Sequence, residues 1–103
     1  MNSSINKYDS IENLIYDEKL RIEKIDFHPE LDEMLIVLNT KAVLHQHLSS
    51  YKHLQNATMD ALNNYELIGA GTGIHWHLLD EDLSLKGFLK DELKNVVKGN
   101  TAA

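Results

Sequence analysis

The 103-residue sequence contains no cysteine, and this absence excludes three kinds of chemistry. A chain without thiols forms no disulfide, offers no thiolate ligand to a metal and has no cysteine nucleophile. Its stability must therefore come from packing, and a chain of this length is expected to form one domain with a modest core. The absence of cysteine also fits a reducing compartment, so we expect a cytoplasmic protein.

Long apolar runs are absent as well. The sequence has no stretch of about 18 apolar residues, so it predicts no transmembrane helix. The first seven residues, MNSSINK, contain no apolar run of the kind that a signal peptide needs. We therefore expect no membrane partner.

Basic residues are outnumbered by acidic ones. Ten Lys and Arg stand against 16 Asp and Glu, which gives a formal net charge of -6. Binding to a phosphate backbone needs clustered basic side chains, so we expect no direct nucleic-acid ligand. The acidic balance instead favours solubility and a basic partner. The hydrophobic fraction of 43% argues against disorder throughout the chain.

The spacing of apolar residues predicts an α+β fold. We expect a small antiparallel sheet of about four to five strands, with short helices and a C-terminal amphipathic helix packed on it. Short polar connections between the first three strands favour a meander. In the first strand the alternation changes parity at Glu23 and Lys24, which predicts a β-bulge. The predicted strands span residues 20–27, 33–38, 42–48, 65–68 and 74–77.

Residues 1–19 are expected to form an N-terminal extension or a short helix capped by Asp9 or Ser10. The single domain would then span residues 20–98, and residues 99–103 would be a tail. Ser49 or Ser50 and Thr58 are suited to cap two further short helices. Ser84 would cap the C-terminal helix and Gly99 would end it. Its apolar residues at helical spacing are Leu85, Phe88, Leu89, Leu93, Val96 and Val97.

One stretch, residues 69–84, holds three of the five glycines and the only tryptophan. Gly69, Gly71 and Gly73 alternate with other residues, whereas a nucleotide-binding fingerprint needs G-x-G-x-x-G between a strand and a helix. Here Ile74 begins an extended pattern, and no Lys-Ser/Thr pair follows. The glycines therefore predict positive-φ backbone, a bulge or a tight turn.

The histidines suggest a metal site as one alternative. On a strand, His75 and His77 would share a face, as would His45 and His47. Two such strands side by side would bring four imidazoles together, enough for zinc or nickel. The other interpretation is that these are ordinary surface histidines, because a register slip of one residue would put one pair on the other face. If the protein is an interaction module, as argued below, we expect no cofactor.

Trp76 would point away from His75 and His77 on an extended strand. It is either the anchor of the core or an exposed hot spot for a partner.

The acids Asp80, Glu81 and Asp82 are either a solvated turn before a helix or a docking patch for basic side chains.

A histidine beside a carboxylate permits acid–base chemistry. No nucleophile, oxyanion hole or pocket accompanies it, so we expect that the protein is not an enzyme.

The segment YELIGAGTGIHWHLLDEDLSLKGFL at residues 65–89 resembles the end of a bacterial family, domain-of-unknown-function family 2442. That family typically carries G-x-GIHWP-x-LDEDLS-x-x-GLL. Residues 51–58 and 35–48 resemble two further segments of it. His77 stands where the family has proline, and Lys52-His53 replaces Pro-Arg. A site of four histidines would therefore be peculiar to this protein.

The resemblance implies a small α+β domain with an antiparallel sheet and no established catalytic residues. Members are often encoded beside a small partner protein, in pairs that look like toxin–antitoxin pairs. We therefore expect a non-enzymatic protein-interaction module, the antitoxin-like member of such a pair, that binds a small basic protein. Its expected binding surface comprises Gly71, Gly73, His75, Trp76, Asp80, Glu81 and Asp82.

Two other functions remain open. A metal-binding or metal-sensing protein would use His45, His47, His75 and His77 as ligands. A structural homodimer would pair through a free sheet edge or the C-terminal helix.

Overall fold

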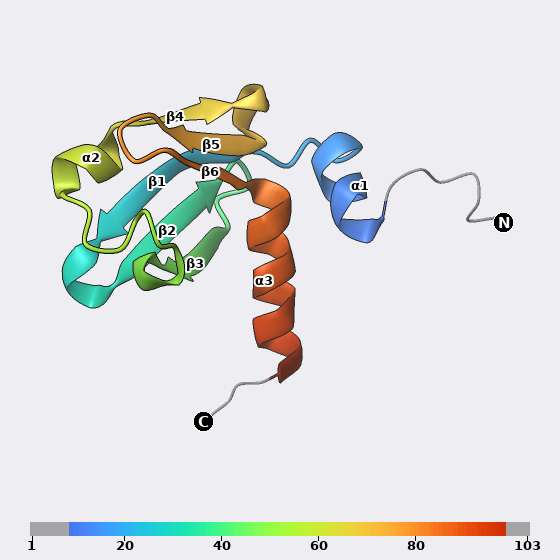
Figure 1. The fold of residues 1–103 in the computed structure, drawn as a ribbon. Helices are drawn as coiled ribbons and strands as arrows, with labels where there is room; N and C mark the ends of the chain where they lie inside the picture. The colour runs from blue at the N-terminus through green and yellow to red at the C-terminus, as the bar shows by residue number, and fades with distance from the viewer. Residues whose placement is uncertain (1–8, 99–103) are drawn as a thin grey trace, which may run out of the picture.

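The computed structural model describes residues 9–98, which form two three-stranded antiparallel sheets and three α-helices (Figure 1). The first sheet has the order β1 (Ile22–His28), β2 (Glu33–Leu38), β3 (Val43–His47), and the second has the order β4 (Tyr65–Ile68), β5 (Gly73–Trp76), β6 (Glu81–Ser84). The helices are α1 (Ser10–Tyr16), α2 (Met59–Asn63) and α3 (Leu85–Lys98). The predicted α+β class is confirmed, but the expected single sheet is two sheets.

The first sheet follows the alternation of its sequence. Met34, Ile36 and Leu38 of the central strand β2 are all buried on one face. The register between β1 and β2 shifts between Ile22 and Lys24, so the predicted bulge is confirmed. A 3₁₀ turn at Pro29–Leu31 joins the two strands.

The second sheet contains a strand that the sequence did not predict. In β6, Glu81 lies opposite Trp76 and Leu83 lies opposite Ile74. The acids at 81 and 82 therefore belong to an edge strand, and they do not form the expected cluster at the start of a helix. An edge strand tolerates exposed charge, which hides it from a search for apolar runs.

Trp76 lies in the core between the second sheet, α2 and β1. Its side chain is 0% exposed, and its Nε1 donates a hydrogen bond to the Leu62 carbonyl at 2.9 Å. Its ring centroid lies 6.3 Å from those of Phe27 and Tyr65. The Tyr65 hydroxyl in turn accepts a hydrogen bond from the Ile25 amide at 3.0 Å. Trp76 is therefore the core anchor, and the alternative of an exposed hot spot is wrong.

The glycine-rich segment forms the tight turn between β4 and β5. Gly69, Ala70 and Gly71 have consecutive φ values of 57°, 56° and 99°. A Cβ on Gly71 would lie 2.8 Å from the Ile22 carbonyl oxygen, closer than side chains approach backbone. The prediction of positive-φ backbone is confirmed, and it explains why glycine stands at 69 and 71.

Two of the predicted helix caps form as expected. Thr58 Oγ1 accepts from the Ala61 amide at the start of α2, and Ser84 Oγ accepts from the Gly87 amide at the start of α3. At α1 the cap is Asp9, in a capping box with Glu12.

The helix expected after Ser49 does not form. Ser49 donates its amide and its hydroxyl to the Asp32 carboxylate at 2.9 and 2.6 Å, which ties it to the β1–β2 turn instead. A 3₁₀ turn at Leu48–Ser50 and further turns occupy this segment. Gly99, the expected end of α3, lies outside the described residues. None of the helices within residues 9–98 has the length and apolarity to cross a bilayer.

We predict that Trp76→Ala lowers the free energy of unfolding by about 3–5 kcal/mol, because it leaves a large cavity. Trp76→Phe keeps an aromatic ring but leaves the Leu62 carbonyl unpaired, and should cost about 1–3 kcal/mol. Urea denaturation followed by circular dichroism measures both. A Trp76→Ala variant as stable as the wild type would contradict the anchoring role.

The turn offers a matched pair of substitutions. Gly71→Ala should destabilise the fold by about 1–3 kcal/mol, because it adds a Cβ against backbone at positive φ. Ala70→Gly, at an exposed neighbouring position, should stabilise the fold or leave it unchanged, because it relieves an alanine held at φ 56°. Melting temperatures test the pair, and equal effects of both changes would refute the strained turn.

Candidate functional site

The predicted partner-binding surface is only partly accessible. Gly71, Gly73 and Trp76 are buried, so the structure does not expose them to a partner at its surface. His75 and Glu81 are partly buried, whereas the side chains of Asp80 and Asp82 are exposed. What remains of the predicted surface is a strip of histidine and acid along β5 and β6.

The acids on this strip lie close to histidines of the same chain. Asp82 lies opposite His75 in the sheet, and its Oδ1 is 2.6 Å from His75 Nδ1. His53 Nδ1 lies 3.1 Å from Glu81 Oε1 and 3.0 Å from the Asp80 carbonyl oxygen. Two of the three carboxylates thus have a neighbouring imidazole, which competes with the basic side chains that the docking hypothesis requires.

The four histidines of the metal hypothesis do not come together. His45 and His47 lie exposed on β3 in the first sheet, 3.6 Å from Glu33 and 3.8 Å from Asp32, respectively. His75 lies on β5 of the second sheet and His77 lies in the turn that follows β5, with ring centroids 6.0 Å apart. Within residues 9–98, no group of three or more His, Asp or Glu side chains is placed to hold a metal ion. The alternative of a four-histidine cluster is therefore wrong, because the strands that carry His45 and His75 lie in different sheets.

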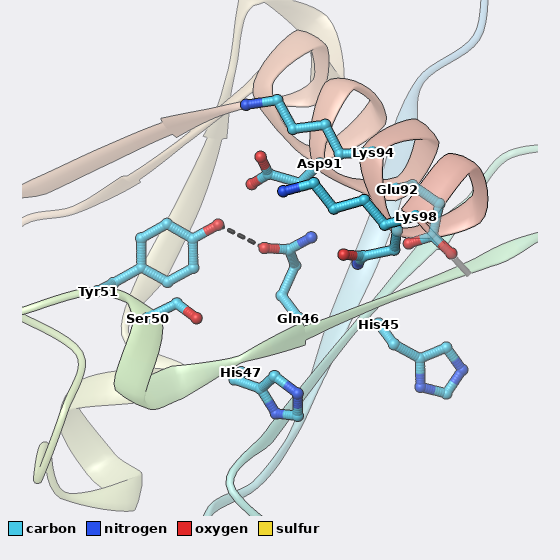
Figure 2. A pocket seen from close by; sticks show the side chains of 10 residues that line it. His45, Gln46, His47, Ser50, Tyr51, Asp91, Glu92, Lys94 and Lys98 are labelled. Carbon is cyan, nitrogen blue, oxygen red and sulfur yellow. Dashed lines mark hydrogen bonds between the residues drawn. The ribbon is translucent and has the colours of Figure 1, made fainter. Parts of the chain in front are cut away.

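A polar groove of about 460 Å³ separates β3 from α3 (Figure 2). On its floor the Tyr51 hydroxyl donates a hydrogen bond to Gln46 Oε1 at 2.5 Å, and Gln46 is only 8% exposed. Asp91, Lys94 and Lys98 reach over the opening from α3. Burial raises the pKa of Tyr51 to about 12, and the carboxylates of Asp91 and Glu81 add to the effect. Charges of both signs line this groove, so charge alone selects no ligand for it.

A second groove, of about 330 Å³, lies between α1 and α3. Its apolar lining comes from Ile11, Leu93 and Val97, and its rim carries three lysines: Lys90, Lys94 and Lys98. Leu93 is 52% exposed, Val96 69% and Val97 82%. We call these six lining residues together with Val96 the α1–α3 surface.

The sequence predicted an amphipathic helix packed on the sheet, and this holds only for its first half. Leu85 and Phe88 are buried, but α3 then extends away from the second sheet, with α1 beside its first turns (Figure 1). The later turns of α3 run beside β3, but they present Asp91 and Asn95 to that strand and place Leu93 and Val97 on the α1 side. The sequence contains a pattern that indicates this mixed surface. Lysines recur every four residues along the helix, at 86, 90, 94 and 98, beside the later apolar residues.

The raised pKa of Tyr51 predicts that the free energy of unfolding depends on pH. The folded state holds this pKa at about 12, above the ordinary value of 10.0, so it favours the neutral hydroxyl. That contribution to stability is complete below about pH 10 and is lost as the pH rises through the folded pKa. Tyr51→Phe should therefore lose less stability than the wild type between about pH 10 and 12. Denaturation curves across this range test it, with Tyr16→Phe, at an exposed tyrosine, as the control.

Comparison with known proteins identifies a family and two similar structures. Residues 22–93 match the family described as protein of unknown function (DUF2442). A crystal structure of a protein of unknown function from Rhodospirillum rubrum is similar, with 28% identity and a TM-score of 0.61 over 70% of this chain and 87% of that chain. No curated protein matches the chain.

A solution structure of an uncharacterized protein from Chromobacterium violaceum shares the fold over the full length of both chains, at 22% identity and a TM-score of 0.64. The family match begins at the first residue of β1 and ends inside α3, so α1 and residues 94–98 lie outside it. The match covers well over half of the sequence, including the glycine turn, Trp76 and the acidic strand. The chain therefore belongs to the family of proteins of unknown function DUF2442.

Proposed function

We propose that this protein is a non-enzymatic protein-interaction module that binds a partner protein through the α1–α3 surface. The observation that carries the proposal is the exposure of Leu93, Val96 and Val97 on the last turns of α3. Three large aliphatic side chains grouped on one helix end and rimmed by lysines are typical of a protein-binding surface.

The fold itself has no need of these apolar side chains. Asp91 and Asn95 of the same helical turns line the polar groove toward β3, whereas Leu93 and Val97 line the groove toward α1. This end of α3 thus presents polar residues to its own sheet and apolar residues to the α1 side. Leu93 and Val97 do not belong to the hydrophobic core of the described residues, and a partner that covers them would explain leucine and valine at these positions.

The family resemblance supports a choice of partner. Because related genes often stand beside a gene for a small protein, the product of the adjacent gene is the first candidate, and this chain would be the antitoxin-like member of the pair. The acidic strip of Asp80 and Asp82 is the competing docking surface, as expected for a basic partner. The two surfaces lie on different elements, so each can be substituted without changing the other, and the effects on binding can be compared.

We predict that Leu93→Ser with Val97→Ser weakens binding of the adjacent gene product by about tenfold or more, because apolar contact area is lost at the centre of the surface. Titration calorimetry of the purified proteins measures the affinity. Both residues are largely exposed, so the variant should keep the wild-type circular dichroism spectrum and melting temperature.

The matched control is Asp80→Asn with Asp82→Asn, which leaves the α1–α3 surface intact. Asparagine suits the positive φ of residue 80, so this control should also fold. Loss of binding in the control, with full binding by the serine variant, would move the interface to the acidic strip. That result would refute the α1–α3 surface and favour docking of a basic partner.

A further inference from the structure

We propose that the partner segment bound at the α1–α3 surface is an acidic amphipathic helix, lying along α3 as a continuation of α1. This inference rests on the proposed function and names the chemistry of the partner at the same surface. Its basis is that α1 already shows, within this chain, how a helix docks on α3.

The contact between α1 and α3 combines apolar burial with an acid–lysine pair. Ile15 is 2% exposed in the core, and Ile11, four residues earlier, packs partly buried against it. Beside them, Lys86 Nζ lies 2.7 Å from Glu12 Oε2 and 3.6 Å from Asp9 Oδ2. The hydrogen bond from Lys86 holds the pKa of Glu12 below its ordinary value. One lysine of α3 thus receives two carboxylates of α1.

The pattern of lysine and aliphatic residues continues along α3 past Lys86, beside Ile11 of α1. Residues four apart share one face of a helix, about 6 Å from one to the next, so Lys90, Lys94 and Lys98 continue the row begun by Lys86. Leu93 and Val97 lie beside this row as apolar positions. Within residues 9–98, Lys86 pairs with carboxylates at 4 Å or less, whereas the other three lysines of the row form no such pair.

The charge around the groove between α1 and α3 determines which kind of partner segment fits it. A rim of three lysines favours carboxylates and disfavours a basic segment. A second copy that paired its α3 antiparallel across this groove would set lysine against lysine. A phosphate backbone would satisfy the lysines but would leave the aliphatic floor of Ile11, Leu93 and Val97 exposed. An acidic helix with aliphatic residues at i and i+4 satisfies both the rim and the floor, as α1 does at Lys86.

The probe for the test is a labelled helical peptide that repeats the Ile-Glu-x-x-Ile arrangement of α1 over three to four turns and contains no basic residue. Two control peptides carry lysine in place of glutamate, or serine in place of isoleucine. Fluorescence anisotropy with the full chain measures binding. We expect the acidic apolar peptide to bind at least about tenfold more tightly than either control.

Charge-reversal variants complete the design. Lys94→Glu with Lys98→Glu should weaken binding of the acidic peptide by about tenfold or more. Lys24→Glu with Lys52→Glu makes the same change in net charge at distant exposed positions and should alter binding by less than about twofold. Raising the salt concentration from about 50 to about 500 mM should weaken wild-type binding, because exposed charges are screened.

Three outcomes would overturn the inference. The first is equal or tighter binding of the basic peptide. The second is unchanged binding of the acidic peptide by the Lys94/Lys98 variant. The third is a concentration-dependent dimer in light scattering that the Leu93/Val97 serine variant abolishes, which would assign the surface to a second copy. If the adjacent gene product still needs Leu93 and Val97 while the acidic peptide does not bind, the proposed function stands and only the acidic helix is refuted.

Discussion

The fold depends on the burial of one indole ring. Trp76 projects from β5 to contact Phe27 of the first sheet, and its N–H bonds the carbonyl of Leu62 in α2. One side chain thus joins the two sheets and the helix between them. A large ring with a single donor suits this position, because the ring supplies apolar area and the N–H satisfies a carbonyl that would otherwise be buried unpaired. With Trp76 turned inward, the alternate residues of β5 face outward, and this places His75 opposite Asp82 on the surface.

Charge is distributed unevenly over this acidic protein. Along β5 and β6, carboxylates lie beside histidines of the same chain. These imidazoles occupy positions that a partner's basic side chains would otherwise take. On α3, lysines at 90, 94 and 98 form a basic row with exposed aliphatic residues beside it. The net charge of -6 is therefore not representative of every part of the surface. The local charge beside the exposed aliphatic residues of α3 is positive.

The α1–α3 surface lies partly outside the residues that match the family, because Lys90 and Leu93 fall inside the match and its other residues fall outside. The residues that match the family contain the core and the acidic strand, whereas α1 and the last turn of α3 lie outside the match. The proposed binding surface is thus formed in part by segments that the family match does not cover.

Local chemistry made much of this structure predictable from the sequence. The parity change at Glu23 and Lys24 indicated the bulge, the glycines indicated positive φ, and Ser84 indicated the start of α3, because each property depends on a few neighbouring residues. Tertiary structure alone decided that the predicted strands form two sheets, that the acids at 81 and 82 lie on a strand, and that Leu93 and Val97 face solvent. Pairing partners are distant in sequence, so strand patterns do not specify them. Helical periodicity likewise shows which face of α3 is apolar, but only the position of the sheet determines how far along the helix that face is covered.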